Sequence, residues 1–367
     1  MDNKKYIERT IELAKSGKGF VSPNPMVGCV ITTNNMITSV GWHKKFGDNH
    51  AEVNAINNSN SKDFTNSTIY ITLEPCTHYG KTPPCTDLII KNKFKKVVFG
   101  VLDSNPEVAG KSINKLKNAG IEVQYGFCQS QINWLNRTFF KNIKKQSPYI
   151  ISKFAQSIDG KIMSSTGKSK WITSKESRSK THEFRAEFDA IMIGTNTAKH
   201  DNPSLNVRLI QGRDPKRIIL DKNLKLNSDL NLFSENNTNP ELTHIIYNQN
   251  LADKTKENIY LKRGINLIGC PVDSKNKLNI KSILPTLYKK YNIGSIIVEG
   301  GAYLHSYFAD NKLIDEFHIF IAPKIIGNGK GAFDNFYIDE VDEAITYETK
   351  DIQTLGNDTL IIATPIY

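Results

Sequence analysis

The sequence predicts an α/β protein made of two domains, residues 1–146 and residues 147–367. Its 367 residues are enough for two domains of ordinary size. Short apolar runs alternate with amphipathic segments in both halves, and strands that alternate with helices are typical of α/β folds. Between the halves, residues 141–148 are polar and end in proline, as expected of a boundary between domains.

The first half is expected to form a three-layer α/β domain. Residues 5–16 have apolar side chains near helical spacing and predict an opening helix. Asn34-Asn35 lies between two strand-like runs, which is typical of a tight hairpin. Because proline is favoured at the first position of a helix, Cys76 after Pro75 is expected to open a helix, whose positive end would lower the pKa of its thiol. The expected elements after the opening helix are strands at 26–32 and 36–43, a helix from His50, a strand at 68–73, the helix from Cys76 and a strand at 96–103.

The second half is expected to form a mostly parallel sheet with helices between its strands. A long helix is expected at 174–189, and the last two apolar runs are candidates for an antiparallel edge. Apolar strands such as 315–323 are also candidates for pairing across a homo-oligomer, which we expect to be a dimer or a tetramer. The expected strands lie at 149–155, 190–194, 217–221, 243–247, 265–269, 295–301, 315–323 and 359–365.

Composition and charge narrow the class of protein. No apolar run approaches the roughly 20 residues that span a bilayer, and the N-terminal segment lacks the pattern of a signal peptide. We therefore expect a cytoplasmic protein without membrane association. The net charge of +11 comes from dispersed lysines, which favours phosphorylated small-molecule substrates over a nucleic-acid partner. A disulfide framework is not expected from five scattered cysteines in a chain of this length.

The residues with the clearest chemistry are His50, Glu52, Cys76 and Cys85. One imidazole and two thiolates suit a tetrahedral zinc ion whose fourth position stays open for a water molecule that the metal can activate. Glu52 is placed to move protons without binding the metal. The pattern H-x-E followed by P-C-x-x-C is typical of zinc deaminases, and here the gap between the cysteines is wider. Two alternatives stay open: a structural zinc with His78 as fourth ligand, and a Glu52 carboxylate that is only solvated.

Longer stretches of both halves resemble one family. SPNPMVGCVI, GWH at 41–43, HAEVNAI and EPCTHYGKTPPC resemble the deaminase half of the bifunctional riboflavin-biosynthesis family. The reductase half of that family is similar to KFAQSIDGKI, SKWITS, FRAEFDAIMIGTNTAKHDNPSLNVR and IIVEGGAYL. The resemblance covers nearly the whole chain. It implies a cytidine-deaminase-like N-terminal domain and a C-terminal α/β domain like that of dihydrofolate reductase.

The resemblance also implies the activities, the cofactors and the site residues. Zinc-dependent deamination of a phosphoribosylaminopyrimidine would be followed by NADPH-dependent reduction of the ribosyl to a ribityl chain. His50, Cys76 and Cys85 would hold the zinc, Glu52 would be the proton shuttle, and Asn24 and His43 would contact the pyrimidine ring. The implied NADPH contacts are Ala155, Trp171, Thr197, Asp201, Gly300 and Gly301. The implied substrate contacts of the reductase are Ser169, Arg185, Leu205, Arg208 and Glu299.

Simpler roles remain open for several of these residues. Asp201 is also suited to capping a turn, Arg185 to a surface ion pair, and Trp171 to a half-buried core position. Gly300-Gly301 is also compatible with a tight turn alone. The sequence departs from the usual family pattern at Asn202, at Ser104 and at Lys111-Ser112.

Two other function classes were weighed against this one. A nucleic-acid base deaminase, acting on tRNA with an accessory domain, is disfavoured by the wide gap between the cysteines. A catalytically dead nucleotide-binding scaffold is disfavoured by the intact zinc motif with its acid. The residues alone do not distinguish NADPH from NADH.

Overall fold

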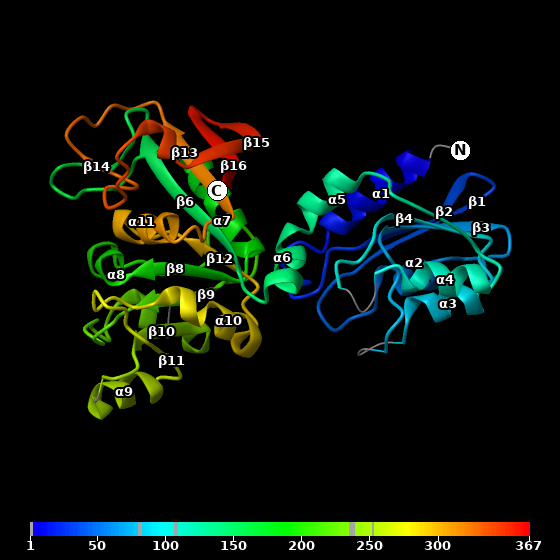
Figure 1. The fold of residues 1–367 in the computed structure, drawn as a ribbon, viewed down its shortest axis with the longest axis horizontal. Helices are drawn as coiled ribbons and strands as arrows, with labels where there is room; N and C mark the ends of the chain where they lie inside the picture. The colour runs from blue at the N-terminus through cyan, green and yellow to red at the C-terminus, as the bar shows by residue number, and fades with distance from the viewer. Residues whose placement is uncertain (1–2, 80–82, 106–108, 235–238, 252) are drawn as a thin grey trace. The chain divides into compact units, whose positions relative to one another are not determined.

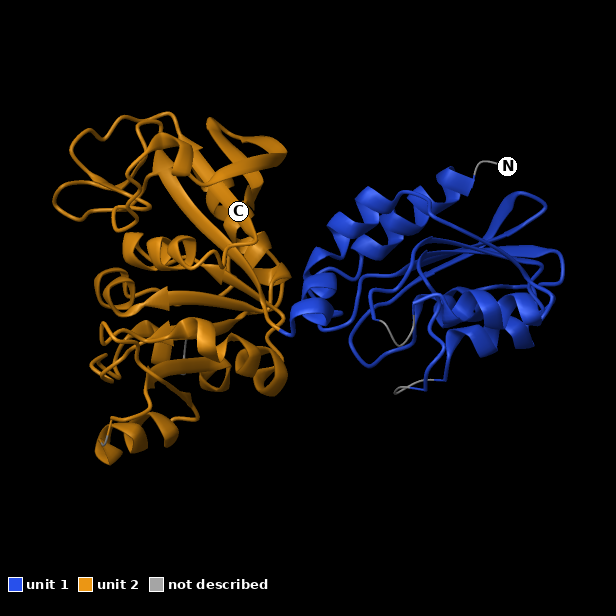
Figure 2. Cartoon of the chain, in the orientation of Figure 1, with its two compact units in different colours: residues 1–146 blue, residues 147–367 orange. Residues whose placement is uncertain are grey.

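A computed structural model describes residues 3–79, 83–105, 109–234, 239–251 and 253–367 (Figure 1). Residues 80–82 of the widened cysteine motif lie outside these ranges, as do residues 106–108. The chain divides into two compact units, residues 1–146 and residues 147–367, which are described separately (Figure 2).

Unit 1 is built on a five-stranded sheet with the strand order β2-β1-β3-β4-β5. β1 is antiparallel to both β2 and β3, whereas β3, β4 and β5 are parallel. The predicted hairpin is confirmed, and Asn34 and Asn35 both have positive φ, at 52° and 64°. A two-residue hairpin turn requires this conformation, which asparagine tolerates. The strands are β1 (Gly28–Thr33), β2 (Met36–Trp42), β3 (Ser67–Leu73), β4 (Lys96–Val101) and β5 (Glu122–Tyr125).

Helices cover both faces of this sheet. Ile31 and Ile69 pack in a core with helices α2, α3 and α4, while their neighbours Val30 and Tyr70 pack in a second core with α1 and α5. Alternation with a period of two therefore buries both faces of the strands, and the predicted three-layer arrangement is confirmed. The helices are α1 (Asn3–Lys15), α2 (Ala51–Asn57), α3 (Cys85–Lys91), α4 (Lys111–Asn118), α5 (Gln129–Leu135) and α6 (Arg137–Lys145).

One expectation for unit 1 is wrong. The helix expected from Cys76 begins instead at Cys85, because the connection continues to Pro84, whose extended backbone immediately precedes the first helical turn. Cys76 lies in that connection, where its carbonyl accepts a hydrogen bond from the Thr86 amide at 3.2 Å. The polar segment 141–148 is mostly helical, because its first five residues complete α6.

Unit 2 contains a nine-stranded sheet with the order β11-β10-β9-β8-β12-β6-β13-β16-β15. The first seven strands in this order are parallel, and the predicted antiparallel pairing of β13 with β16 is confirmed. β13 has hydrogen-bonded strands on both sides, so its expected pairing across an oligomer is wrong. The strands are β6 (Tyr149–Ser157), β8 (Ala190–Gly194), β9 (Lys216–Leu220), β10 (Thr243–Asn248), β11 (Asn266–Cys270), β12 (Ser295–Val298), β13 (Glu316–Ala322), β15 (Thr346–Leu355) and β16 (Asp358–Ile366), with β7 (Lys161–Met163) and β14 (Lys330–Gly331) in a separate pair.

Helices also pack on both faces of the unit 2 sheet. Ile218 and Ile246 share a core with α10 and α11, whereas the alternate residues Ile219 and Ile245 share one with α8 and α9. Because β6, β8 and β12 are parallel, their carboxyl ends lie at one edge of the sheet, where ligands bind in open α/β folds. The helices are α7 (Lys175–Glu187), α8 (Thr195–Asp201), α9 (Lys254–Leu261), α10 (Ile280–Tyr291) and α11 (Ala302–Asp310), with short 3-10 helices at Asn231–Phe233, Pro240–Leu242 and Val341–Glu343.

None of the helices in the described ranges combines the length and the apolar composition that crossing a bilayer requires.

Candidate functional site

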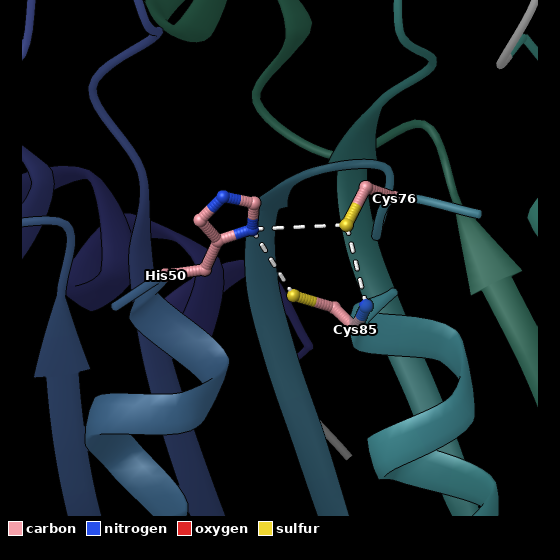
Figure 3. Close-up of side chains that lie close together, drawn as sticks. All are labelled: His50, Cys76 and Cys85. Atoms are coloured by element: carbon pink, nitrogen blue, oxygen red, sulfur yellow. Dashed lines mark hydrogen bonds between the residues drawn. The ribbon is translucent and has the colours of Figure 1, made fainter. Parts of the chain in front are cut away.

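His50, Cys76 and Cys85 come together in unit 1 (Figure 3). The His50 Nδ1 atom lies 3.2 Å from Cys85 Sγ and 3.7 Å from Cys76 Sγ. His50 directly precedes α2, Cys76 follows β3, and Cys85 is the first residue of α3. All three donor atoms lie within 4.8 Å of one another, which suits ligands around a single ion.

The donor chemistry of this cluster fits zinc. The backbone amide of Cys85 donates to Cys76 Sγ at 3.2 Å, and hydrogen bonding by the Cys85 thiol lowers the pKa of Cys76 to about 4. The same thiol pair, together with burial, raises the pKa of Cys85. One thiolate is therefore already favoured, and a bound cation would favour the second. Among the residues that the structure describes, His78 does not join this group, which argues against the closed structural site.

Glu52 lies in the first turn of α2 and is only 3% exposed. Burial removes its carboxylate from water and raises its pKa, with the charge of His50 acting in the opposite direction. The simpler interpretation of Glu52 as a solvated carboxylate is therefore wrong. A buried carboxyl group with a raised pKa beside the metal ligands suits proton transfer.

The cluster opens on a cavity of about 320 Å³, lined by His50, Glu52 and Cys76. Asn24 and His43, the two expected ring contacts, line it as well. Four further residues that line the cavity were not predicted from the sequence. Two of them are polar, Asp103 and Asn105, and two are apolar, Phe139 and Ile143. The two apolar ones lie on α6, which the sequence analysis did not identify as a helix.

His43 is held in one orientation. Its Nδ1 atom lies 3.0 Å from the Asn49 carbonyl oxygen, and its Nε2 atom lies 3.2 Å from Asn24 Nδ2. Burial lowers the pKa of His43, which favours the neutral ring. With the proton on Nδ1, the ring donates to Asn49 and accepts from the Asn24 amide. The remaining N–H of that amide is then available to a ligand.

In unit 2, Arg185 and Glu299 form a buried bidentate pair. Arg185 Nε donates to Glu299 Oε1 at 3.0 Å, and Nη2 donates to Oε2 at 2.7 Å. Both side chains are about 10% exposed, so the alternative of a surface ion pair for Arg185 is wrong. Burial alone would raise the pKa of Glu299, but Arg185 and Lys153 outweigh it and lower this pKa to about 2.

Lys153 and His182 belong to the same charged group, and sequence reasoning missed both. Lys153 lies on β6, where burial lowers its pKa and the negative charge of Glu299 acts in the opposite direction. His182 Nδ1 accepts a hydrogen bond from the Arg208 amide at 3.3 Å. Burial and the two arginines lower the pKa of His182 to about 4, so the ring stays neutral and keeps this acceptor. A lysine in the middle of an otherwise apolar strand was the available signal for Lys153.

The expected cofactor residues Thr197 and Gly301 meet at the carboxyl edge of the sheet. The Gly301 amide donates to Thr197 Oγ1 at 3.2 Å and joins the start of α11 to α8. A Cβ on Gly300 would lie 2.7 Å from Leu304 Cδ2, so a side chain at this position would require Leu304 to shift. A Cβ on Gly301 would be 3.8 Å from Thr197 Oγ1, which is an ordinary contact distance.

Two lysine side chains form hydrogen bonds that hold the loop containing Trp171. Lys170 Nζ donates to the Asp201 carbonyl at 3.2 Å, and Lys324 Nζ donates to the Trp171 carbonyl at 2.9 Å. The Trp171 side chain is 63% exposed with the Arg178 guanidinium 4.4 Å from its ring centre, so the core position considered for it is wrong.

The other expected reductase residues differ in exposure. Ala155 and Ser169 are partly exposed, and Arg208 is exposed. Leu205 is 3% exposed and packs in the core, so a ligand would reach only its backbone. Asn202 ends α8 in the left-handed conformation, and its side-chain oxygen accepts a hydrogen bond from the Asn231 backbone amide at 2.7 Å.

Comparison with known families covers most of the chain. Residues 1–101 match the cytidine and deoxycytidylate deaminase zinc-binding region, and residues 148–361 match the RibD C-terminal domain. The riboflavin biosynthesis protein RibD of Aquifex aeolicus is 40% identical over 362 residues, which are 98% of this chain and 97% of the relative. RibD of Escherichia coli is 32% identical, with 98% of this chain and 99% of the relative covered.

Solved structures show the same similarity over the full length. An Acinetobacter baumannii RibD structure has a TM-score of 0.88 and 33% identity, and the match covers 100% of this chain and 99% of that one. A Thermotoga maritima structure, described as a diaminohydroxyphosphoribosylaminopyrimidine deaminase and 5-amino-6-(5-phosphoribosylamino)uracil reductase, has a TM-score of 0.85 and 34% identity. That match covers 99% of each chain. The predicted fold class, cytidine-deaminase-like followed by a reductase domain, is confirmed.

Proposed function

The chain belongs to the RibD family of bifunctional riboflavin-biosynthesis enzymes, and on this premise we propose that residues 1–146 carry the deaminase and residues 147–367 the reductase. The protein is a zinc-dependent deaminase and an NADPH-dependent reductase that act on a phosphoribosylaminopyrimidine. The first reaction replaces an amino group of the pyrimidine by a carbonyl, and the second reduces the ribosyl to a ribityl chain. The tRNA deaminase and the dead scaffold are not favoured.

One observation supports the deaminase site most directly: three soft ligands converge beside a buried carboxylate at the base of a cavity. His50, Cys76 and Cys85 would hold zinc, which when bound activates water at its open position. Glu52 would take a proton from that water and deliver protons to the ring nitrogen and to the leaving ammonia. Asn24 and the neutral His43 would orient the ring.

In the reductase, we propose different roles for Arg185 and Arg208. The Nε and Nη2 donors of Arg185 are both engaged by Glu299, so Arg185 would serve to hold this carboxylate in place. The exposed Arg208 is the better candidate for the 5-phosphate, because within the described part of the chain its guanidinium makes a single hydrogen bond, to Asn206 Oδ1 at 3.0 Å. Glu299 and Lys153 would then face the sugar, with Ser169 and the Leu205 backbone at its sides.

NADPH would bind at the carboxyl edge of the sheet. The N-terminus of α11, directly after Gly301, suits cofactor phosphates, which favour helix N-termini. Thr197, Asp201, Trp171 and Ala155 would complete this site, with the nicotinamide delivering hydride to the sugar C1.

Metal analysis tests the deaminase proposal. We expect about one zinc per chain, because a catalytic site with three protein ligands holds one ion. Removing it with a chelator should abolish ammonia release, while NADPH oxidation on the deaminated intermediate continues. A metal-free preparation that still releases ammonia would refute the zinc site.

We also propose that the enzyme is a cytoplasmic homo-oligomer, a dimer or a tetramer, acting on a free small molecule and not on nucleic acid or a membrane. Exposed apolar side chains on the edge hairpin, Tyr347, Ile352 and Ile366, favour association of unit 2. Light scattering should therefore give a mass of two or four times 41.3 kDa. A monomer at micromolar concentration would contradict this proposal.

A further inference from the structure

Glu74, between β3 and the ligand Cys76, has a carboxylate that is buried and fully hydrogen-bonded. Its side chain is 3% exposed. Oε2 accepts from the backbone amides of Asp103 at 3.2 Å and Gly110 at 3.0 Å. Oε1 accepts from Ser112, from its amide at 3.2 Å and from its hydroxyl at 2.7 Å. Four donors on one carboxylate fill its acceptor positions, and they compensate the cost of burying its charge.

Glu74 lines the deaminase cavity together with Cys76, Asp103 and Asn105, and one of the four bonds joins it directly to Asp103. The other three bonds join Glu74 to Gly110 and Ser112 at the start of α4. The Asp103 carboxylate in turn accepts from the Asn105 amide at 2.9 Å. Glu74 therefore helps to fix the position of Asn105 through Asp103. It also accepts hydrogen bonds from the first turn of α4, where the helix dipole favours a negative charge.

We propose that Glu74 is a positioning residue that sets the Asp103–Asn105 wall of the pyrimidine cavity relative to the zinc ligand Cys76, with Ser112 as its partner. The proposal rests on the proposed deaminase function of this cavity. It also gives a role to Ser112, one of the departures from the family pattern, because its hydroxyl makes the shortest of the four bonds. Small displacements of residues that position a substrate weaken catalysis strongly, even when the reacting groups are intact.

Glu74→Gln and Ser112→Ala test the proposal in the full-length enzyme. Glutamine keeps the volume of Glu74 but replaces one carboxylate oxygen by an NH₂ group. In either orientation that NH₂ group faces at least one backbone N–H, so at least one of the four hydrogen bonds is lost. We expect the KM of Glu74→Gln for the pyrimidine to rise about tenfold or more, with a smaller change in kcat and unchanged zinc content. Ser112→Ala, which removes one bond of four, should raise KM by a smaller factor in the same direction.

Ser67→Ala is the matched control. Ser67 is also fully buried, and its hydroxyl lies 2.8 Å from Thr33 Oγ1 at the opposite end of β3 from Glu74. Ser67→Ala should lose a side-chain hydrogen bond, as Ser112→Ala does, but without a change in the KM for the pyrimidine. NADPH oxidation on the deaminated intermediate measures the intact reductase in every preparation.

The outcomes separate the possible roles. A zinc-loaded Glu74→Gln with normal KM would overturn the proposal, and so would a rise in KM of equal size in Ser67→Ala. If Glu74→Gln does not fold, Ser112→Ala decides: a raised KM supports the positioning role, and an unchanged KM overturns it. Failure of the wild-type enzyme to release ammonia would instead refute the proposed function itself.

Discussion

Glu52→Gln should reduce ammonia release by a factor of about 10²–10⁴, the usual contribution of a positioned general acid–base group. The substitution preserves the shape of a side chain that is 3% exposed, but the amide cannot carry a proton between water and the leaving group. Zinc content should not change, because Glu52 is outside the ligand group. The measurement is ammonia production from the pyrimidine, with zinc analysis of the same preparation.

NADPH oxidation provides the control for Glu52→Gln. Supplied with the deaminated intermediate, the variant should reduce it at the wild-type rate, because each unit has its own cores and its own proposed site. Glu12→Gln, an exposed substitution on α1, should leave both activities unchanged. Equal loss of both activities in a folded Glu52→Gln enzyme would contradict two independent sites.

The elements that could be predicted from the sequence are those in which buried side chains follow one another at regular spacing. β3 and β8 are continuous apolar runs covered on both faces, and the Asn34-Asn35 hairpin has a recognisable turn. β15 was missed because it is an edge strand with almost every side chain exposed, so neither an apolar run nor alternation identifies it. α6 was missed because its lysines conceal an apolar face that packs on unit 1.

The cluster of His50, Cys76 and Cys85 was predictable because spacing and residue type carry its chemistry directly. Glu74 and Lys153 were not, because their roles depend on which distant segments fold against them. Glu74 meets Ser112, 38 residues away, and Lys153 meets Glu299 across neighbouring strands. Likewise, Cys76 follows Pro75 in a pattern that is compatible with a helix start, and only the later Pro84 places that start at Cys85.

Arg185→Ala should destabilise unit 2 by about 3–5 kcal/mol and abolish reduction, because it leaves the Glu299 carboxylate buried without its partner. The guanidinium contacts both carboxylate oxygens, with each side chain about 10% exposed, so water cannot replace it without rearrangement. Thermal unfolding of unit 2 and NADPH oxidation measure the two effects, and ammonia release should stay at the wild-type level.

The double variant Arg185→Met/Glu299→Gln separates stability from catalysis. It removes both charges, so most of the stability lost in Arg185→Ala should return, whereas reduction should remain absent because the carboxylate is missing. Recovery of NADPH oxidation in this variant would exclude Glu299 from the reductase site. Stability that does not recover would show that the pair acts through packing and not through charge.

The same pair predicts a pH dependence of stability. Arg185 and Lys153 hold the pKa of Glu299 at about 2, below the ordinary value of 4.5, because the ionised form is favoured only in the folded protein. A lowered carboxyl pKa stabilises the fold at pH values above the unfolded pKa, and this contribution disappears as the pH falls from about 5 towards 2. Wild-type unit 2 should therefore lose stability over that window more steeply than Glu299→Gln, in which no proton is taken up at this position. Parallel pH profiles of unfolding for the two proteins would show that Glu299 is not held ionised by its neighbours.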